Sequence, residues 1–358
     1  MNQDYIVPSA WSIIEEGFDK DRVKSSESLF SIGNGSMGQR ANFEEEYSGP
    51  TFQGSYIGGV YYPDKTRVGW WKNGYPEYFA KVINAPSWIG IKVRIDGEAL
   101  DLNACAEIKD FRRELNMKEG WLGRSFTATL QNGVRVKVKA KRFLSLQLDE
   151  LGAIKYEVTP LDQDVSISYE PYLDSGITNE DTNWDDQFWN TLSVREDGNR
   201  AFIEAHTMKT FFYVCTAMAN TFTVDGKEIS LSLKTNKTDT YIGHVYETDI
   251  REGETFAINK FAGYVTSFNH DKDALYGAAN AVLDKAMDKG YKTMLEEQKQ
   301  AWANIWAMAD ITIDGDVKAQ QGIRFNILQL NQTYLGKDAR LNIGPKGFTG
   351  EKYGGSTY

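Results

Sequence analysis

Runs of carboxylates are the residues of this chain whose types could do acid–base chemistry. The adjacent sets are Glu44-Glu45-Glu46, Asp185-Asp186 and Glu296-Glu297. Cleavage of a glycosidic bond by water uses two carboxyl groups that flank the bond. Neighbouring residues of a strand point to opposite faces, and those of a helix lie about 100° apart, so adjacency alone does not place two carboxyl groups at one bond. We therefore interpret each set as part of a solvated face.

A second pattern, Gly33-Asn-Gly-Ser-Met-Gly38, has the G-x-G-x-x-G order of dinucleotide-binding loops. That role requires a preceding strand, a following helix whose N-terminus faces the pyrophosphate, and an acidic residue about twenty positions further on. Residues 39–47 have no apolar helical stripe, and residues 51–57 contain no acid. We therefore expect a turn in which glycines adopt positive φ, without nucleotide binding.

Other patterns of catalytic or metal sites are not found in the sequence. Residues 336–350 lack the G-x-x-x-x-G-K-[ST] order of a phosphate-binding loop, and no G-x-S-x-G nucleophile elbow occurs. The three histidines, His206, His244 and His270, have no histidine partner four positions away. We expect neither a metal site nor a cofactor.

The charge balance bears on the partners of the chain. A formal charge of −10 and a pI near 5.0 argue against nucleic acid, because a phosphate-binding surface needs a concentrated basic face. The densest basic run, Lys137-Val-Lys-Ala-Lys-Arg142, belongs to an alternation that predicts a strand with one solvated basic face.

The N-terminus and the cysteines bear on the compartment. Residues 1–11 have neither the basic start nor the apolar centre of a secretion signal, and no window approaches eighteen uninterrupted apolar residues. We expect no secretion and no membrane contact. Cys105 and Cys215 are too few for a disulfide framework and fit reduced thiols in the cytoplasm.

The elements that must position any site are mostly strands up to about residue 268. Short runs of alternating or β-branched residues are separated by turn residues, and Asp96-Gly97 is a strong hairpin signal. We predict strands at residues 89–95, 133–139, 153–158, 165–169 and 211–215. Many short strands at near-regular spacing predict two stacked antiparallel sheets.

A helical pattern begins after Asn269. Apolar residues recur at three- and four-residue steps in 272–288 and 291–309, with a break at Gly290. The positions that carry these stripes are Leu275, Ala279, Val282, Ala286, Leu295, Trp302, Ile305, Trp306 and Ala309. We expect a short strand at 311–314 and then a helix with Asp316 as its N-cap, which ends at Gly336. Its apolar face would contain Ile323, Ile327, Leu330 and Tyr334.

Several stretches, in order along the whole chain, resemble the maltose phosphorylase branch of glycoside hydrolase family 65. They are Trp11-Ser-Ile13, residues 27–45, Tyr47-Ser-Gly49, Gln53-Gly54, the run Tyr61–Ala85 with Tyr-Pro-Asp-Lys-Thr-Arg and Trp-Trp-Lys-Asn-Gly, and the tail Gly344–Tyr358. The tail resembles the run that leads into the family's Trp-Asp-Thr-Glu sugar-binding motif. The resemblance implies that this motif would directly follow Tyr358.

The resemblance implies a mostly β fold: an antiparallel β-supersandwich at 1–268, a helical linker at 269–315, and the first helix of an incomplete (α/α)6 barrel at 316–358. Full-length members cleave maltose with inorganic phosphate as co-substrate and with inversion, giving β-D-glucose 1-phosphate and D-glucose. The catalytic acid and the phosphate pocket would then lie beyond Tyr358. The resemblance also implies a homodimer that acts on an α-glucoside disaccharide.

The residues that the resemblance places nearest to a sugar are in the loop 346–353. Lys346, Glu351 and Tyr353 would lie at the periphery of the sugar pocket, and no catalytic residue would lie within the chain, which we expect to be inactive by itself. Two alternatives stay open. The substrate could be another α-glucoside such as trehalose or kojibiose, or the chain could be a non-catalytic sandwich for carbohydrate binding or dimerisation. The aromatic content of 13% fits a sugar surface and a sandwich core equally.

Overall fold

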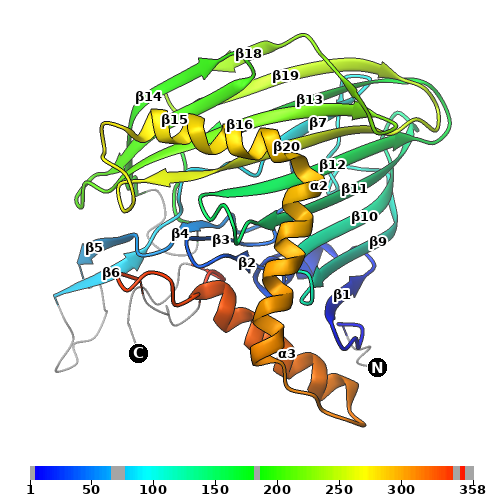
Figure 1. Cartoon of the computed structure of the whole chain (residues 1–358). Helices are drawn as coiled ribbons and strands as arrows, with labels where there is room; N and C mark the ends of the chain where they lie inside the picture. The colour runs from blue at the N-terminus through cyan, green and yellow to red at the C-terminus, as the bar shows by residue number, and fades with distance from the viewer. Residues whose placement is uncertain (1–4, 66–76, 181–185, 342–346, 351–358) are drawn as a thin grey trace.

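Two antiparallel sheets, packed face to face, form the body of the chain (Figure 1). The computed structural model describes residues 5–65, 77–180, 186–341 and 347–350. The larger sheet has ten strands in the order β1-β9-β10-β11-β12-β20-β16-β15-β14, with β17 paired to β16. Its strands are β1 (Ser12–Glu16), β9 (Glu107–Asn116), β10 (Trp121–Thr129), β11 (Arg135–Leu144), β12 (Leu151–Pro160), β14 (Trp189–Asp197), β15 (Arg200–Thr207), β16 (Tyr213–Val224), β17 (Lys227–Ile229) and β20 (Phe256–Thr266).

The second sheet has five strands in the order β18-β19-β13-β7-β8. Its strands are β7 (Ile91–Ile95), β8 (Glu98–Ala99), β13 (Val165–Asp174), β18 (Lys234–Lys237) and β19 (Tyr241–Ile250). The β7–β8 hairpin turns at Asp96 and Gly97, whose φ angles of 50° and 80° are those of a type I′ turn. The five predicted strands correspond to β7, β11, β12, β13 and β16, so the mostly β, antiparallel fold is confirmed.

The core between the two sheets follows from side-chain alternation. Every second residue of β13 is buried, and Tyr169 on this strand stacks on Phe256 of β20 with ring centroids 4.5 Å apart. The Tyr169 hydroxyl donates to the backbone oxygen of Phe256 at 2.9 Å, which satisfies its polar end. In β11 the predicted alternation is confirmed from Arg135 to Lys139, where the basic residues are exposed and the valines buried.

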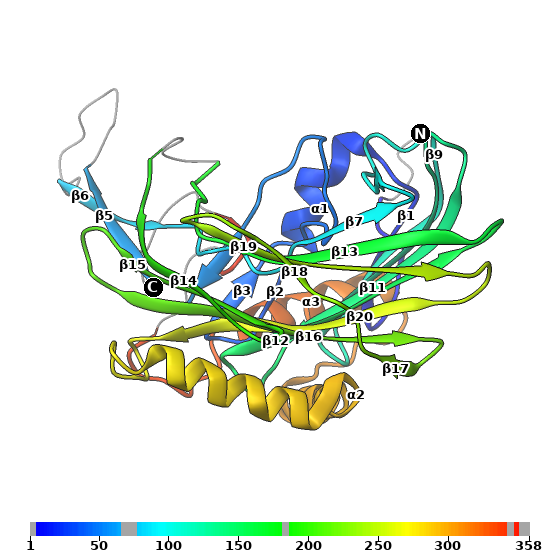
Figure 2. The same cartoon turned by 90° about the horizontal axis from the view of Figure 1, so that it is seen from above.

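Smaller elements lie outside the two sheets and are spread along the length of the sandwich (Figure 2). They are η1 (Lys20–Arg22), α1 (Val23–Leu29), the sheet of β2 (Ile32–Gly33), β3 (Met37–Gln39) and β4 (Ser55–Ile57), and the hairpin of β5 (Tyr61–Lys65) and β6 (Tyr78–Val82). The hairpin projects away from the body (Figure 1).

Helix α2 (Leu275–Ala309) covers the outer face of the larger sheet over β12, β16 and β20 (Figure 2). The predicted stripe of its first half is confirmed, because Leu275, Ala279, Val282 and Ala286 are all buried. Gly290 has φ 69° and ψ 163° and kinks the helix at the predicted break.

Helix α3 (Val317–Thr333) begins as predicted, since Asp316 accepts a hydrogen bond from the Ala319 amide at 3.0 Å. The predicted strand at 311–314 is wrong. The side-chain oxygen of Gln320 accepts from the Ile313 amide at 2.6 Å, and its amide nitrogen donates to the Ile311 carbonyl at 2.8 Å. The Gln320 side chain therefore hydrogen-bonds the backbone amide and carbonyl that a neighbouring strand would otherwise have paired.

The buried face of α3 is mostly polar, which the apolar periodicity did not predict. The buried residues are Gln320, Gln321, Arg324, Leu328, Gln332 and Thr333. Leu330 is 57% exposed, and Ile323 and Ile327 are half-buried. The helix faces the N-terminal segment with its amides and its arginine, so most of the predicted apolar face lies away from that contact.

Candidate functional site

Lys346, Glu351 and Tyr353, the residues predicted near a sugar, lie outside the described residues. Of the predicted loop, Gly347–Gly350 is described. Its Phe348 is 7% exposed and packs against the β2–β3 hairpin. The described part of the loop is therefore anchored to the N-terminal part of the chain.

The hairpin that receives Phe348 contains the G-x-G-x-x-G pattern. Gly33 ends β2 and Gly38 lies in β3, and Gly35, with φ 84°, turns the chain between them. No helix follows the pattern before β4, so the predicted turn is confirmed. A Cβ on Gly33 would lie 2.6 Å from the Phe348 ring, which shows a second reason for glycine here.

A cavity of about 380 Å³ lies beside this turn, between Asn34, Asp149, Asn269 and the segment after α3. Arg340 of that segment donates to the carboxylate of Asp338 at 2.5–3.1 Å and to the side-chain oxygen of Asn269 at 2.7 Å. These hydrogen bonds lower the pKa of Asp338 to about 2. The polar groups of this cavity are therefore largely engaged in hydrogen bonds that hold the segment after α3 and join it to the sandwich.

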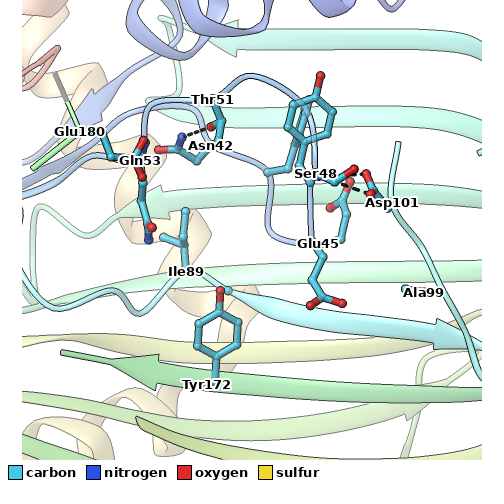
Figure 3. Close-up of a pocket in the computed structure, with 14 residues that line it drawn as sticks. Asn42, Glu45, Ser48, Thr51, Gln53, Ile89, Ala99, Asp101, Tyr172 and Glu180 are labelled. Carbon is cyan, nitrogen blue, oxygen red and sulfur yellow. Dashed lines mark hydrogen bonds between the residues drawn. The ribbon is translucent and has the colours of Figure 1, made fainter. Parts of the chain in front are cut away.

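A larger cavity, of about 480 Å³, lies between the loop 42–53 and the sheet strands β7 and β13 (Figure 3). We name it the loop–sheet cavity. Its lining combines acids, amides, hydroxyls and aromatic rings. The fourteen lining residues are Asn42, Phe43, Glu45, Glu46, Tyr47, Ser48, Thr51, Gln53, Ile89, Gly90, Ala99, Asp101, Tyr172 and Glu180.

A buried ion cluster holds the loop side of this cavity. Arg124 of β10 donates to Glu44 at 2.7 Å and donates hydrogen bonds to both carboxylate oxygens of Glu45. Arg142 of β11 donates to Glu44 at 2.9 Å and to the Asn42 carbonyl at 2.8 Å. Glu44 and Glu45 are 5% and 4% exposed, so their interpretation as part of a solvated face is wrong.

The two arginines explain why these carboxylates can be buried. Burial opposes ionisation of Glu44, but Arg142 and Arg124 outweigh it and lower the pKa of this carboxyl below its usual value. Burial likewise opposes the charge of Arg124, and Glu45 and Glu44 outweigh it and raise the pKa of this guanidinium. The sequence did contain a hint of this cluster. Arg124 and Arg142 occupy inward positions in the alternation of β10 and β11, and a buried arginine needs a carboxylate partner.

The sheet side of the cavity is held by a buried lysine. Lys260 of β20 is fully buried, and its Nζ donates to the carbonyls of Gly90 at 2.8 Å and Tyr172 at 2.9 Å. The ring of Tyr172 stacks on Tyr241 with centroids 5.2 Å apart. A Cβ on Gly90 would collide with the Tyr172 ring, so the glycine makes room for it.

Besides the buried Tyr47 hydroxyl, three polar side chains of the cavity have no hydrogen-bond or ionic partner within the described part of the chain. They are the Glu46 carboxylate, the Gln53 side-chain amide and the Tyr172 hydroxyl. Figure 3 shows Tyr172 rising from the sheet toward the loop. Sequence reasoning gave no site role to Gln53, which entered only through the resembling stretch Gln53-Gly54, or to Tyr172, which belongs to no motif. The fold alone brings both to Glu46.

Comparisons with known proteins agree with this architecture. A model described as "Glycosyl hydrolase family 65, N-terminal domain" matches residues 13–305, and one described as "Glycosyl hydrolase family 65 central catalytic domain" matches residues 324–358. A solved structure, titled a putative kojibiose phosphorylase from human microbiome, superposes with a TM-score of 0.88 at 27% identity, over 98% of this chain and 45% of that one. Within the described residues, no helix is both long and apolar enough to cross a membrane.

Curated relatives match along almost the entire chain. Maltose phosphorylase of Bacillus subtilis is 44% identical over 100% of this chain and 46% of its own length. Alpha,alpha-trehalose phosphorylase of Thermoanaerobacter brockii is 32% identical over 96% and 45%, and kojibiose phosphorylase of Halothermothrix orenii is 29% identical over 97% and 44%. The chain thus spans about half the length of these relatives. Since the N-terminal domain model alone matches well over half of its residues, this protein belongs to glycoside hydrolase family 65.

Proposed function

We propose that this chain is the N-terminal part of an inverting disaccharide phosphorylase. In its complete form the enzyme converts maltose and inorganic phosphate into β-D-glucose 1-phosphate and D-glucose. The observation that carries the proposal is the gradient of identity, from 44% with a maltose phosphorylase to 32% with a trehalose phosphorylase and 29% with a kojibiose phosphorylase. Trehalose and kojibiose are the alternative substrates.

The chemistry needs only one carboxylic acid from the protein. Phosphate is already an anionic nucleophile, whereas water in an inverting hydrolase needs a second carboxylate as base. Glu44, which lies beside the loop–sheet cavity, does not suit the acid's role, because the buried guanidinium groups of Arg142 and Arg124 lower its pKa below the usual value. We place the acid and the phosphate ligands beyond Tyr358, with Lys346, Glu351 and Tyr353 near the sugar, and assign no cofactor.

The same proposal divides the chain into a sandwich at 1–268, a linker at 269–315 and the start of a barrel at 316–358. The change from strand to helix between Thr266, where β20 ends, and Leu275, where α2 begins, supports the first boundary. The half-exposed apolar face of α3 supports the second, because a first barrel helix needs partners for Ile323, Ile327 and Leu330. We further propose that the protein is cytoplasmic and forms a homodimer. Light scattering of the purified protein would test the dimer.

Two assays test the proposal. The 358-residue chain, given maltose and phosphate, should release no glucose 1-phosphate above a buffer control. The chain extended by its natural continuation should release it from maltose faster than from trehalose or kojibiose. Turnover by the 358-residue chain would overturn the placement of the acid, and a preference of the extended protein for another disaccharide would overturn the substrate.

A further inference from the structure

We propose that the loop–sheet cavity binds one unit of a neutral saccharide. The proposal rests on the cavity itself and does not depend on the function proposed above. At about 480 Å³ the cavity falls within the range of roughly 300–1,000 Å³ that small-molecule sites occupy. A single hexose unit is small enough to enter such a volume with part of its surface left open to solvent.

The side-chain polar groups of Glu46, Gln53 and Tyr172 match the hydroxyls of a sugar. The Glu46 carboxylate can only accept hydrogen bonds, the Gln53 amide can donate and accept, and the Tyr172 hydroxyl can do both. They come from a loop before β4 and from β13, and so converge from both walls of the cavity. A cation would need acceptors alone, whereas sugar hydroxyls use donors and acceptors together.

The charge of the lining selects a neutral ligand. Glu46, Asp101 and Glu180 supply three carboxylates besides Glu45, which Arg124 already pairs, and none of the fourteen described lining residues is a lysine or an arginine. A phosphorylated sugar would bring its negative charge among these carboxylates, and the nearby Lys92 already pairs with Glu170 at 3.8 Å. A free sugar carries no such penalty, because its hydroxyls donate to carboxylates.

The walls are fixed before a ligand arrives. Arg124 and Arg142 hold Glu44 and Glu45 next to Glu46, and Lys260 of the larger sheet donates to the carbonyls of both Gly90 and Tyr172 on the smaller sheet. The Tyr172 ring is stacked on Tyr241, so its hydroxyl points into the cavity without a search over rotamers. Such pre-organisation lowers the entropic penalty of binding.

The test measures binding of maltose, glucose and glucose 1-phosphate to the 358-residue chain by ligand-observed NMR titration. Maltose and glucose should bind, and glucose 1-phosphate should bind at least about tenfold more weakly. Glu46→Ala removes an unpartnered carboxylate, and Tyr172→Phe removes a hydroxyl but keeps the ring. Each should weaken maltose binding about tenfold, as expected for the loss of hydrogen bonds worth roughly 1.4 kcal/mol.

Glu196→Ala is the matched control and should bind maltose like the wild type, since Glu196 is an exposed glutamate of β14 outside the cavity lining and makes no hydrogen bond or ion pair among the described residues. Circular dichroism melting of every variant confirms that the fold is kept. The proposal is wrong if maltose does not bind, if neither Glu46→Ala nor Tyr172→Phe weakens binding, or if glucose 1-phosphate binds as tightly as glucose.

Discussion

The ring of Phe348 occupies the space beside Gly38 where a side chain at that position would lie. More than three hundred residues separate the two in sequence, and Gly38 lies in strand β3 of the hairpin that also holds Gly33. The described part of the C-terminal loop therefore depends on the hairpin having glycine at both positions. The Gly33–Gly38 pattern, which resembles a nucleotide-binding loop, instead packs against an aromatic ring.

Gly38→Ala should lower the free energy of unfolding by about 1–3 kcal/mol, because a methyl group there overpacks against Phe348. Urea denaturation measures this change. In a Phe348→Ala background the same substitution should have a much smaller effect, so a double-mutant cycle isolates the contact. Gly322→Ala, in an open position of α3, is the control and should be neutral or stabilising. Equal effects of Gly38→Ala in both backgrounds would contradict the contact.

Gly35→Ala tests the backbone of the same turn. Gly35 has φ 84°, which an alanine adopts only with strain, so we expect a loss of about 1 kcal/mol or more in the free energy of unfolding. This loss should persist when Phe348 is replaced, because it arises from the backbone. A titration with NAD and ATP should show no binding, and binding of either would revive the nucleotide interpretation.

Glu44→Leu should destabilise the chain by about 3–5 kcal/mol at pH 7, because Arg142 would be left buried without a carboxylate. The folded pKa of Glu44 lies below its unfolded value near 4.5, so the stability it supplies is fully present above pH 4.5. That stability is lost as the pH falls through the folded pKa. The difference between wild type and Glu44→Leu, measured by urea denaturation, should therefore shrink below pH 4.5.

Arg135→Met is the control for the buried cluster. Arg135 lies on the same strand as Arg142 and pairs with Asp162 through two hydrogen bonds of 2.6 and 2.7 Å, but both side chains are exposed. Water screens such a pair, so its loss should change stability far less than Glu44→Leu does. Similar losses for the two variants would contradict the importance of burial.

Lys260→Met should alter how stability depends on pH in the alkaline range. Burial lowers the folded pKa of Lys260 well below the ordinary value of 10.5, so the unfolded chain binds more protons between these two values. The lysine therefore destabilises the fold most below its folded pKa, and this penalty disappears as the pH rises toward 10.5. Relative to Lys260→Met, the wild type should gain stability through that window. A constant difference between the two proteins would show that Lys260 is not shifted.

Arg324→Ala should release α3 from the N-terminal segment. Arg324 makes two 2.8 Å hydrogen bonds to Asp310, donates to the Ala10 carbonyl at 3.0 Å, and lies 3.6 Å above the Trp11 ring. Hydrogen exchange of the α3 amides should accelerate about tenfold or more, while that of the sheet core stays unchanged. Asn326→Ala changes an exposed residue of the same helix and should not accelerate exchange. Protection of α3 that survives Arg324→Ala would contradict this anchor.

Local patterns in the sequence determined five of the strands, the kink in α2 and the cap of α3. Asp96-Gly97 specified its hairpin, Gly290 the break in α2 and Asp316 the start of α3, because each acts through its own backbone or its nearest neighbours. The family resemblance rested on short stretches that are recognisable by their order alone. None of these features needs a distant residue.

Tertiary structure decided where the charges and the polar faces went. From the sequence, Glu44 and Glu45 were interpreted as surface acids. They can be buried because β10 and β11 bring Arg124 and Arg142 next to them, and the sequence does not reveal this pairing. No strand forms at 311–314, because the Gln320 side chain bonds the Ile313 amide and the Ile311 carbonyl. The side-chain amide of Gln320 on α3 faces inward to make these bonds. Glu46, Gln53 and Tyr172 share a cavity only because two sheets and a loop enclose it, and pairing across such distances is a property of the fold.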